Sequence, residues 1–190
     1  MRKRIAIILA AVLLLAGGGG TWAWMRYNHP VHHFAVIREG VLYRSGQPAG
    51  RWADVYRRTH MKTVISVREV NTQAPWYAEE ERFCKEHGIE LIHMPFLEED
   101  FSETHLHQFV SLVTDPNRQP VLMHCEAGSR RTGVAVAAYR ILVDGWDADR
   151  AIAEAKMLRF VPQENAKSVA MLRQLAAQAS AASQAAPPAK

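Results

Sequence analysis

The sequence predicts an α/β fold with a mostly parallel central sheet flanked by helices. Short apolar runs alternate with amphipathic helical patterns through the middle of the 190-residue chain. The run Val121–Met123 is continuously apolar, which is typical of a parallel strand buried on both faces. Helical patterns dominate from about residue 132 onward. These observations together favour a sheet whose faces are covered by helices.

The predicted strands are short apolar or β-branched runs that end at Gly, Pro or charged residues. The segment "HHFAVIREGVLYRSGQP" contains two strands joined at Glu39-Gly40. The segment "MKTVISVRE" carries the β-branched run Thr63–Val67, and "IELIHMP" ends at Pro95. The last strand lies in "PVLMHC" and ends beside Cys125.

The predicted helices carry start and stop signals. Ser102 is a candidate N-cap, Gly88 and Gly145 follow two helix ends, and Pro162 stands at a first helical position. The five helices are expected in the segments "APWYAEEERFCKEHGIE", "SETHLHQFVSLVTDP", "TGVAVAAYRILVDG", "DADRAIAEAKMLRF" and "PQENAKSVAMLRQLAAQ".

Composition narrows the class of function. Hydrophobic residues make up 48% of the chain and charged residues 22%, which is ordinary for a globular domain. Arg2, Lys3 and Arg4 supply three of the 23 basic residues, so the remainder nearly balances its 19 acidic ones. This gives no electrostatic case for a nucleic-acid partner. Two cysteines form no disulfide framework, and the nine histidines lack metal-ligand spacing, so we expect neither a metal nor another cofactor.

Three regions are predicted along the chain: an N-terminal segment over 1–27, one domain over 28–178 and a disordered Ala/Pro-rich tail over 179–190. The N-terminal segment has a basic start and no charge from Ile5 to Met25, a stretch of 21 residues that is long enough to span a bilayer. We interpret it as an uncleaved signal anchor, with a cleaved signal peptide as the alternative. The positive-inside rule then predicts a single-pass protein of a bacterial inner membrane with the domain in the periplasm.

The loop after the last strand has the features of a phosphate site. In "CEAGSRRT", Cys125 stands at the end of a strand and Thr132 at the start of a helix, where unpaired N–H groups and the helix dipole favour an anion. Gly128 allows the N–H groups to turn inward, and Arg131 offers a fork for two phosphate oxygens. The same field favours the thiolate of Cys125, which is then able to attack phosphorus and form a phosphocysteine.

Other residues of this loop receive supporting roles. Thr132 is positioned to donate a hydrogen bond to the departing sulfur, and the ring of His124 to order the loop backbone. The residues expected to bind phosphate are Glu126, Ala127, Gly128, Ser129, Arg130 and Arg131. Arg130 is expected to point outward toward substrate, and Glu126 to disfavour very highly charged substrates. A buried structural cysteine is the alternative for Cys125, but it does not explain Gly128, Arg131 and Thr132.

The pattern H-C-x5-R-[ST], complete from His124 to Thr132, resembles the signature of the cysteine-based protein tyrosine phosphatase superfamily. The segments "VLYRSGQP", "KTVISVRE" and "HGIELIHMPF" are similar to further blocks of the compact dual-specificity-like phosphatases common in bacteria, and the resemblance covers roughly residues 33–161. It implies a general acid on the loop "PFLEEDFSE". Asp100 is our first choice, Glu98 and Glu99 are alternatives, and an enzyme with no acid from this loop is a third possibility.

Four residues outside the loop are assigned mainly structural roles. Cys84 is interpreted as a core residue, with a redox partner of Cys125 as the alternative. Arg44 and Ser45 either hold the loop or line the phosphate site. Arg68 is expected to be structural, in a salt bridge with Glu69 or Asp100.

The expected activity is cysteine-dependent hydrolysis of phosphomonoesters without metal. The substrate is predicted to be a phosphorylated protein, carrying phosphotyrosine or phosphoserine/threonine, or a phospholipid headgroup beside a membrane. A phosphate-binding module without turnover and a sulfur-transfer domain of the rhodanese type are the alternatives. The sequence carries no signal for the oligomeric state.

Overall fold

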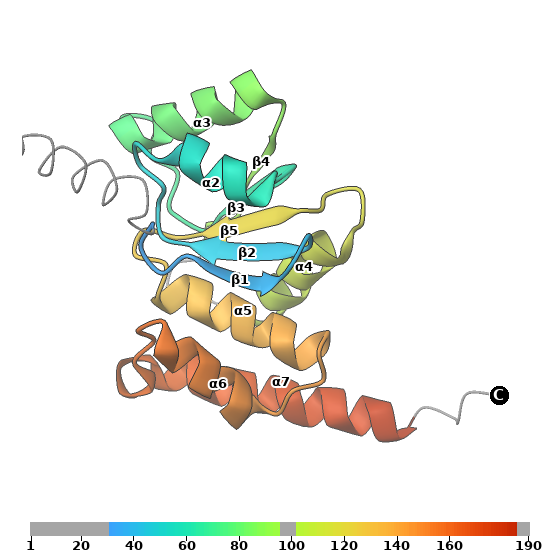
Figure 1. The fold of residues 1–190 in the computed structure, drawn as a ribbon. Coiled ribbons are helices and arrows are strands. Elements are labelled where there is room, and N and C mark those ends of the chain that lie inside the picture. The colour runs from blue at the N-terminus through green and yellow to red at the C-terminus, as the bar shows by residue number, and fades with distance from the viewer. Residues whose placement is uncertain (1–30, 96–101, 186–190) are drawn as a thin grey trace, which may run out of the picture. The chain divides into compact units, whose positions relative to one another are not determined.

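A five-stranded sheet forms the centre of the computed structural model, which describes residues 31–95 and 102–185. The strand order is β1-β2-β5-β3-β4. The strands are β1 (Ala35–Arg38), β2 (Leu42–Ser45), β3 (Thr63–Ser66), β4 (Glu90–His93) and β5 (Val121–His124). The β1–β2 pair is antiparallel and the other pairs are parallel. In Figure 1 the blue strands β1 and β2 lie beside the yellow β5, although the chain separates them widely. The predicted α/β fold is confirmed.

The register of the sheet aligns the carboxyl ends of the parallel strands. Ser45 of β2 and Ser66 of β3 both pair with His124 of β5, and Ser66 also pairs with His93 of β4. All three central strands therefore end at one level. The segments that follow β2, β3 and β5 leave the sheet side by side, which is where sites form in parallel sheets.

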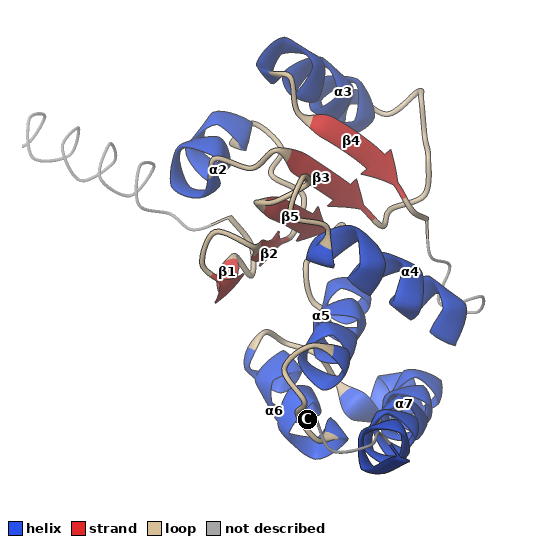
Figure 2. Cartoon of the chain, turned by 90° about the vertical axis from the view of Figure 1, so that its right-hand side faces the viewer, coloured by secondary structure: helices blue, strands red, loops and turns tan. Residues whose placement is uncertain are grey.

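Helices cover both faces of the sheet (Figure 2). On one face lie α2 (Trp52–Thr59) and α3 (Pro75–His87). On the other lie α4 (Glu103–Thr114) and α5 (Arg130–Leu142), and beyond α5 pack α6 (Ala148–Met157) and α7 (Ala166–Ala185), the latter after the 3-10 turn Pro162–Asn165. Alternate residues of a strand belong to two separate cores, since successive side chains point to opposite faces of the sheet. Leu122 packs toward α2 and α3, whereas Val121 and Met123 pack toward α4–α7.

Two of the predicted capping residues lie at helix ends in the structure. Ser102 and His105 form a reciprocal cap at the start of α4, and Gly88 (φ +65°) ends α3. Helix α2 was not predicted. Its buried residues Trp52, Val55 and Thr59 recur at helical spacing, but the helix is only eight residues long and Arg51 precedes it without a side-chain cap.

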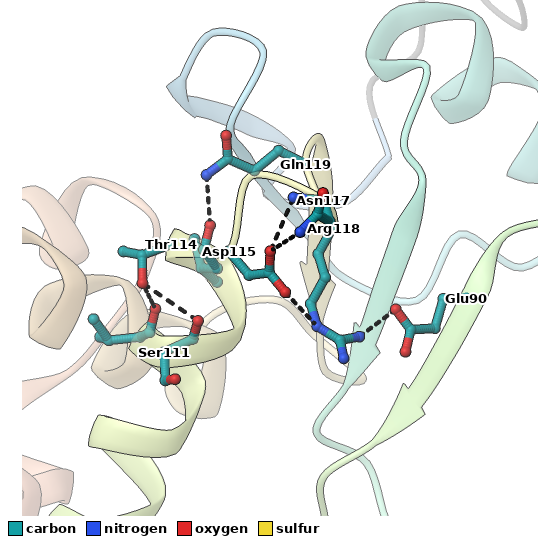
Figure 3. A network of polar contacts seen from close by, with 9 residues as sticks. Glu90, Ser111, Thr114, Asp115, Asn117, Arg118 and Gln119 are labelled. Carbon is teal, nitrogen blue, oxygen red and sulfur yellow. Dashed lines mark hydrogen bonds and ion pairs between the residues drawn. The ribbon is translucent and has the colours of Figure 1, made fainter.

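A polar network fixes the turn between α4 and β5 (Figure 3). The Asp115 carboxylate accepts from the backbone N–H of Asn117 at 2.9 Å and pairs with Arg118, which also bonds Glu90 of β4. The Gln119 side chain donates to the carbonyl of Val113 at 2.8 Å. The turn thereby ties the start of β5 to the end of α4 and to the edge strand.

Two of the predictions concern the ends of the chain. None of the helices in residues 31–95 and 102–185 has the length and apolar character to cross a membrane. This finding contradicts the predicted single-pass location in the inner membrane, which we withdraw. The segment 1–27 on which it rested lies outside the described residues. At the other end α7 runs to Ala185, so residues 179–185 are helical rather than a disordered tail, because Ala is the strongest helix former.

Candidate active site

The loop Cys125–Ser129 joins the end of β5 to the start of α5. The thiol of Cys125 is buried, and the backbone N–H of Gly128 donates to its sulfur at 3.2 Å. Helix α5 begins at Arg130, two residues before the predicted start at Thr132. The sulfur therefore lies within a curl of backbone that leads directly into a helix N-terminus, where the local field favours negative charge.

Two glycines allow this loop to pack against the segment after β2. Gly128 has φ +73°, and a Cβ on it would lie 2.3 Å from the backbone nitrogen of Gly46. A Cβ on Gly46 would lie 2.9 Å from the carbonyl oxygen of Glu126. The N–H of Gln47 donates to that same carbonyl at 2.9 Å. Backbone contacts thus fix the shape of the loop, and no side chain fits between the two segments.

The first turn of α5 carries two of the predicted functional residues. Arg131 is partly buried, and its Nη1 donates to the carbonyl of Val67 at 3.1 Å, which ties the guanidinium to the end of β3. Thr132 is fully buried. Its hydroxyl has no hydrogen-bond partner among residues 31–95 and 102–185. The hydroxyl is therefore able to donate a hydrogen bond to a group that enters the site or to the sulfur of Cys125.

A chain of polar side chains runs along the α3 side of the loop. His124 Nε2 contacts Glu80 Oε1 at 2.8 Å, and both side chains are fully buried. Glu80 Oε2 accepts from the amide of Gln47 at 3.2 Å, whose oxygen accepts from Arg68 at 3.0 Å. Arg68 in turn lies 3.5 Å from the exposed carboxylate of Glu126. The network links the residue before Cys125 to the residue after it.

Glu80 is ionised within this network. Burial opposes ionisation of its carboxyl, but the hydrogen bond and charge of His124, the hydrogen bond from Gln47 and the charge of His93 outweigh it and lower the pKa of Glu80. The ring of Trp52 stands edge-on to His124 at 5.6 Å between centroids. The hydrogen bond to Glu80 and the aromatic contact together fix the orientation of the imidazole beside Cys125.

Arg68 is held at the edge of the site rather than in the predicted pairs. Its guanidinium lies 3.7 Å from the centre of the Trp76 ring and pairs with Glu126 instead of Glu69 or Asp100. Burial lowers the pKa of Arg68, as does the charge of Arg131, and the charge of Glu126 opposes the shift. Arg68 therefore adds positive charge to the same region as Arg131.

Arg44 lies beneath the loop. Its side chain is fully buried, and its Nη2 donates to the carbonyl of Gly128. Burial lowers the pKa of Arg44 to about 10, and the negative charges of Cys125 and Glu154 work in the opposite direction. Its neighbour Ser45 is also buried, and the Ser45 hydroxyl donates to the carbonyl of Gly46. Both residues thus contact backbone at the base of the loop.

The segment before β1 also reaches the loop. The Nδ1 of His33 lies 2.6 Å from the carbonyl oxygen of Ala127, and His33 has the left-handed φ of +51°. The carbonyl of His32 accepts from the N–H of Gly46 at 2.6 Å. This segment holds both the loop and the turn after β2 from outside.

Cys84 lies apart from Cys125. It belongs to the core between the sheet and helices α2 and α3, whereas Cys125 belongs to the core on the other face. Burial, with a contribution from the charge of Glu80, raises the pKa of Cys84 to about 12. A neutral buried thiol of this kind packs as a small apolar side chain.

Several predicted residues have other positions or no described position. The guanidinium of Arg130 lies 3.7 Å from Glu164, in the turn before α7. The candidate acids Glu98, Glu99 and Asp100 lie outside the described residues. Sequence reasoning missed Glu80 and Gln47, which the fold brings to His124 from 44 and 77 positions away in the chain. The only local signals were a carboxylate on the inner face of a predicted helix and a Gln after a predicted strand.

Comparison with known proteins agrees with this geometry. The model of the tyrosine phosphatase family matches residues 29–181. The dual specificity protein phosphatase TpbA of Pseudomonas aeruginosa (strain UCBPP-PA14) is 28% identical over 125 residues, which cover 65% of this chain and 54% of TpbA. The inositol diphosphatase DSP2 of Oryza sativa subsp. japonica is 27% identical over 118 residues, which cover 60% of this chain and 55% of DSP2. The chain thus spans about half the length of these two relatives.

A solved structure shares the fold. The core catalytic domain of the PP-IP phosphatase SIW14 from S. cerevisiae superposes with a TM-score of 0.65 at 23% identity, covering 83% of this chain and 96% of that domain. The resemblance stated from the motif is confirmed, because the family model covers most of the chain. The chain belongs to the tyrosine phosphatase family.

Proposed function

We propose that this protein hydrolyses phosphomonoesters through a phosphocysteine intermediate on Cys125. One observation carries the proposal: the Cys125 thiol lies inside a backbone curl at a helix N-terminus, with the N–H of Gly128 directed at its sulfur. That arrangement stabilises the thiolate and offers N–H donors to the oxygens of a phosphate. Arg131, anchored on the carbonyl of Val67, is placed to bind two of those oxygens.

The reaction has two steps. In the first, the sulfur of Cys125 forms a bond to phosphorus, the ester P–O bond breaks, and a carboxylic acid gives its proton to the leaving oxygen. We assign that acid to Asp100, with Glu98 and Glu99 as alternatives. In the second step water attacks phosphorus, the carboxylate that the acid left behind takes the proton of the water, and the P–S bond breaks. The Thr132 hydroxyl, which has no other partner in the described part of the chain, donates to the departing thiolate.

His124 orients the loop rather than reacting. Its ring is fully buried against Glu80, and its Nδ1 lies 3.3 Å from the carbonyl oxygen of Cys125. Glu80 fixes the ring, and the ring fixes the peptide that carries the nucleophile. Ala127, Ser129 and Arg130 complete the loop that wraps the phosphate.

A phosphorylated protein is the substrate that we favour. TpbA, whose name describes a dual specificity protein phosphatase, supports it, and so does the carboxylate of Glu126 at the mouth of the loop. Glu126 repels a substrate that carries many phosphates. DSP2 and SIW14 are named for inositol phosphate substrates, so an inositol polyphosphate is the competing class, and a phospholipid headgroup is the third.

Turnover of p-nitrophenyl phosphate tests the proposal. We expect the wild-type protein to release phosphate, and Cys125→Ser to lose turnover while still binding inorganic phosphate. Full activity of Cys125→Ser would refute the cysteine mechanism, and binding without turnover in the wild type would favour a phosphate-binding module. A thiosulfate assay excludes or reveals sulfur transfer. Phosphopeptides, phosphoinositides and inositol polyphosphates measured side by side then rank the substrate classes.

A further inference from the structure

Arg44 is the part of the site that the two reaction steps leave without a role. It lies on β2 opposite Met123 of β5, and its side chain has no exposed surface. One terminal nitrogen donates to the carbonyl of Gly128. Its other two nitrogens have no hydrogen-bond partner in residues 31–95 and 102–185. Within the described residues, this buried guanidinium therefore makes its hydrogen bond to the loop Cys125–Ser129.

This charge persists at neutral pH although it is costly to bury. Burial lowers the pKa of Arg44 only to about 10, so the group remains protonated at pH 7. An ionised side chain in the interior requires an anion to offset its desolvation. The negative groups that act on Arg44 are Cys125 and Glu154. Glu154 already pairs with Arg140 at 2.7 Å, which leaves the sulfur of Cys125, when ionised, as the group that compensates Arg44.

The geometry of Gly128 gives this charge a second effect. In a trans peptide the C=O and N–H groups point in opposite directions. The bond from Arg44 to the Gly128 carbonyl therefore turns the N–H of Ser129 away from the buried guanidinium. On the other side of Gly128, its own N–H donates to the sulfur of Cys125 at 3.2 Å. Arg44 thus holds Gly128, and the peptides on the two sides of Gly128 carry N–H donors of the loop.

The other charges near the thiol come from all the elements packed around the loop. Further arginines and three carboxylates lie around the site, and each of these carboxylates has a partner. These groups are Arg68 after β3, Arg131 on α5, Glu126 in the loop paired with Arg68, Glu154 on α6 paired with Arg140, and Glu80 on α3 bonded to His124. Among the cations, Arg44 is the one that is fully buried and turned to the base of the loop.

We propose that Arg44 is a positioning residue whose buried positive charge sets the Gly128 peptide and favours both the Cys125 thiolate and a bound phosphate. The inference rests on the proposed function and deepens it. When the loop holds an anion, the cost of burying the guanidinium is offset, and by linkage the guanidinium strengthens binding of that anion. No contact between Arg44 and substrate is required.

The test compares Arg44→Gln, which keeps a donor without charge, with Arg44→Lys, which keeps the charge. Alkylation of Cys125 by iodoacetamide is followed against pH, with and without inorganic phosphate, in the full chain. Cys125→Ser reports the background labelling of buried Cys84. For Arg44→Gln we expect the midpoint of alkylation to rise by about one pH unit. The phosphate concentration that protects Cys125 should rise about tenfold.

The behaviour of Arg44→Lys distinguishes a role of the positive charge from a role of side-chain packing. Arg44→Lys should keep a midpoint close to that of the wild type. A midpoint and phosphate protection unchanged in Arg44→Gln would overturn the proposal, as would equal shifts in the two variants. The urea midpoint of Arg44→Gln without phosphate should not fall below that of the wild type, because a buried charge that is only partly compensated in the absence of phosphate has been removed. Failure of Arg44→Gln to fold would likewise contradict the proposal.

The same measurements separate this inference from the proposed function. Alkylation and phosphate protection need no turnover. If the wild type binds phosphate but fails to hydrolyse p-nitrophenyl phosphate, the proposed function is wrong while the effect of Arg44 on the thiol is still decided by its own variants.

Discussion

At the scale of single residues, the Thr132 hydroxyl makes the sharpest prediction. It is fully buried without a partner in the described part of the chain, so its removal breaks no hydrogen bond of the free protein. In Thr132→Ala we expect hydrolysis of the phosphocysteine to slow by about 10-fold or more, the worth of one hydrogen bond to a charged group. Rapid-quench kinetics with p-nitrophenyl phosphate should then show a burst of p-nitrophenol.

Thr132→Ser is the matched control, because it keeps the hydroxyl and loses only a methyl group. It should show no larger burst than the wild type. If both variants accumulate the intermediate equally, packing of the methyl group rather than the hydroxyl governs the second step. If neither shows a burst and both keep wild-type turnover, Thr132 has no part in breaking the P–S bond.

The residues of the site differ in how far they were predictable. Cys125, Arg131 and Thr132 lie within eight consecutive residues, so their spacing alone predicts a phosphate loop. Glu80 reaches His124, and Gln47 reaches Glu80, only because β2, β3 and β5 end at one level and α3 packs on that face. No short pattern connects positions so far apart in the chain. A fully buried arginine such as Arg44 is likewise invisible in a sequence, where arginine is expected on the surface.

At the scale of elements, the loop is shaped by its contact with the turn after β2. Gly128 combines a left-handed φ of +73° with a Cβ position 2.3 Å from the nitrogen of Gly46. We expect Gly128→Ala to destabilise the protein by about 3 kcal/mol, from backbone strain and from the overlap together. It should also abolish phosphate binding, since the loop must move. Urea unfolding and phosphate titration measure the two effects.

Gly40→Ala supplies the comparison. Gly40 has φ +70° in the β1–β2 turn, but no atom lies within 4 Å of the place that an added Cβ would take, so only the backbone strain applies. Its cost should be about 1 kcal/mol, with phosphate binding intact. Equal costs at the two positions would mean that the contact between the loop and Gly46 contributes nothing to stability.

The elements were predicted where their sequences are regular. The apolar run of β5 and the capped helices α3 and α4 follow local rules, and each was expected close to its observed bounds. Helix α2 was missed although Trp52, Val55 and Thr59 recur at helical spacing, because it has only eight residues and no side-chain cap marks its start. Helix α5 starts earlier than expected, since Ser129 and Arg130 read as loop residues until the fold is known.

At the scale of the whole molecule, the strand order explains why one loop collects so many partners. Strand β5 lies between β2 and β3, and all three run parallel. The segments that follow β2 and β3 therefore flank the loop after β5, with Gln47 on one side and Arg68 on the other. Helix α3 completes the arrangement from one face of the sheet, because it carries Glu80 to His124.

The buried pair between Glu80 and His124 should make the stability of the whole fold depend on acid pH. The pKa of Glu80 is lowered from its usual 4.5, because the bonds and charges that favour the carboxylate outweigh burial. Below pH 4.5 the unfolded chain then binds a proton that the folded protein excludes. The contribution of Glu80 to stability is thus fully present above that pH and is lost as the pH falls through the lowered value. Urea unfolding between pH 3 and pH 7 measures it.

Glu80→Gln removes the titrating carboxyl, so its unfolding free energy should lack this contribution to the pH dependence. The difference in unfolding free energy between wild type and variant should therefore shrink below pH 4.5. Glu86→Gln is the matched control, since Glu86 is exposed on the same helix and its loss should leave the pH dependence unchanged. If Glu80→Gln follows the wild type in parallel down to pH 3, the pair is not ionised in the folded protein. His124 would then be oriented by a neutral hydrogen bond, and the network from Glu80 through Gln47 to Arg68 would not begin at an ionised carboxylate.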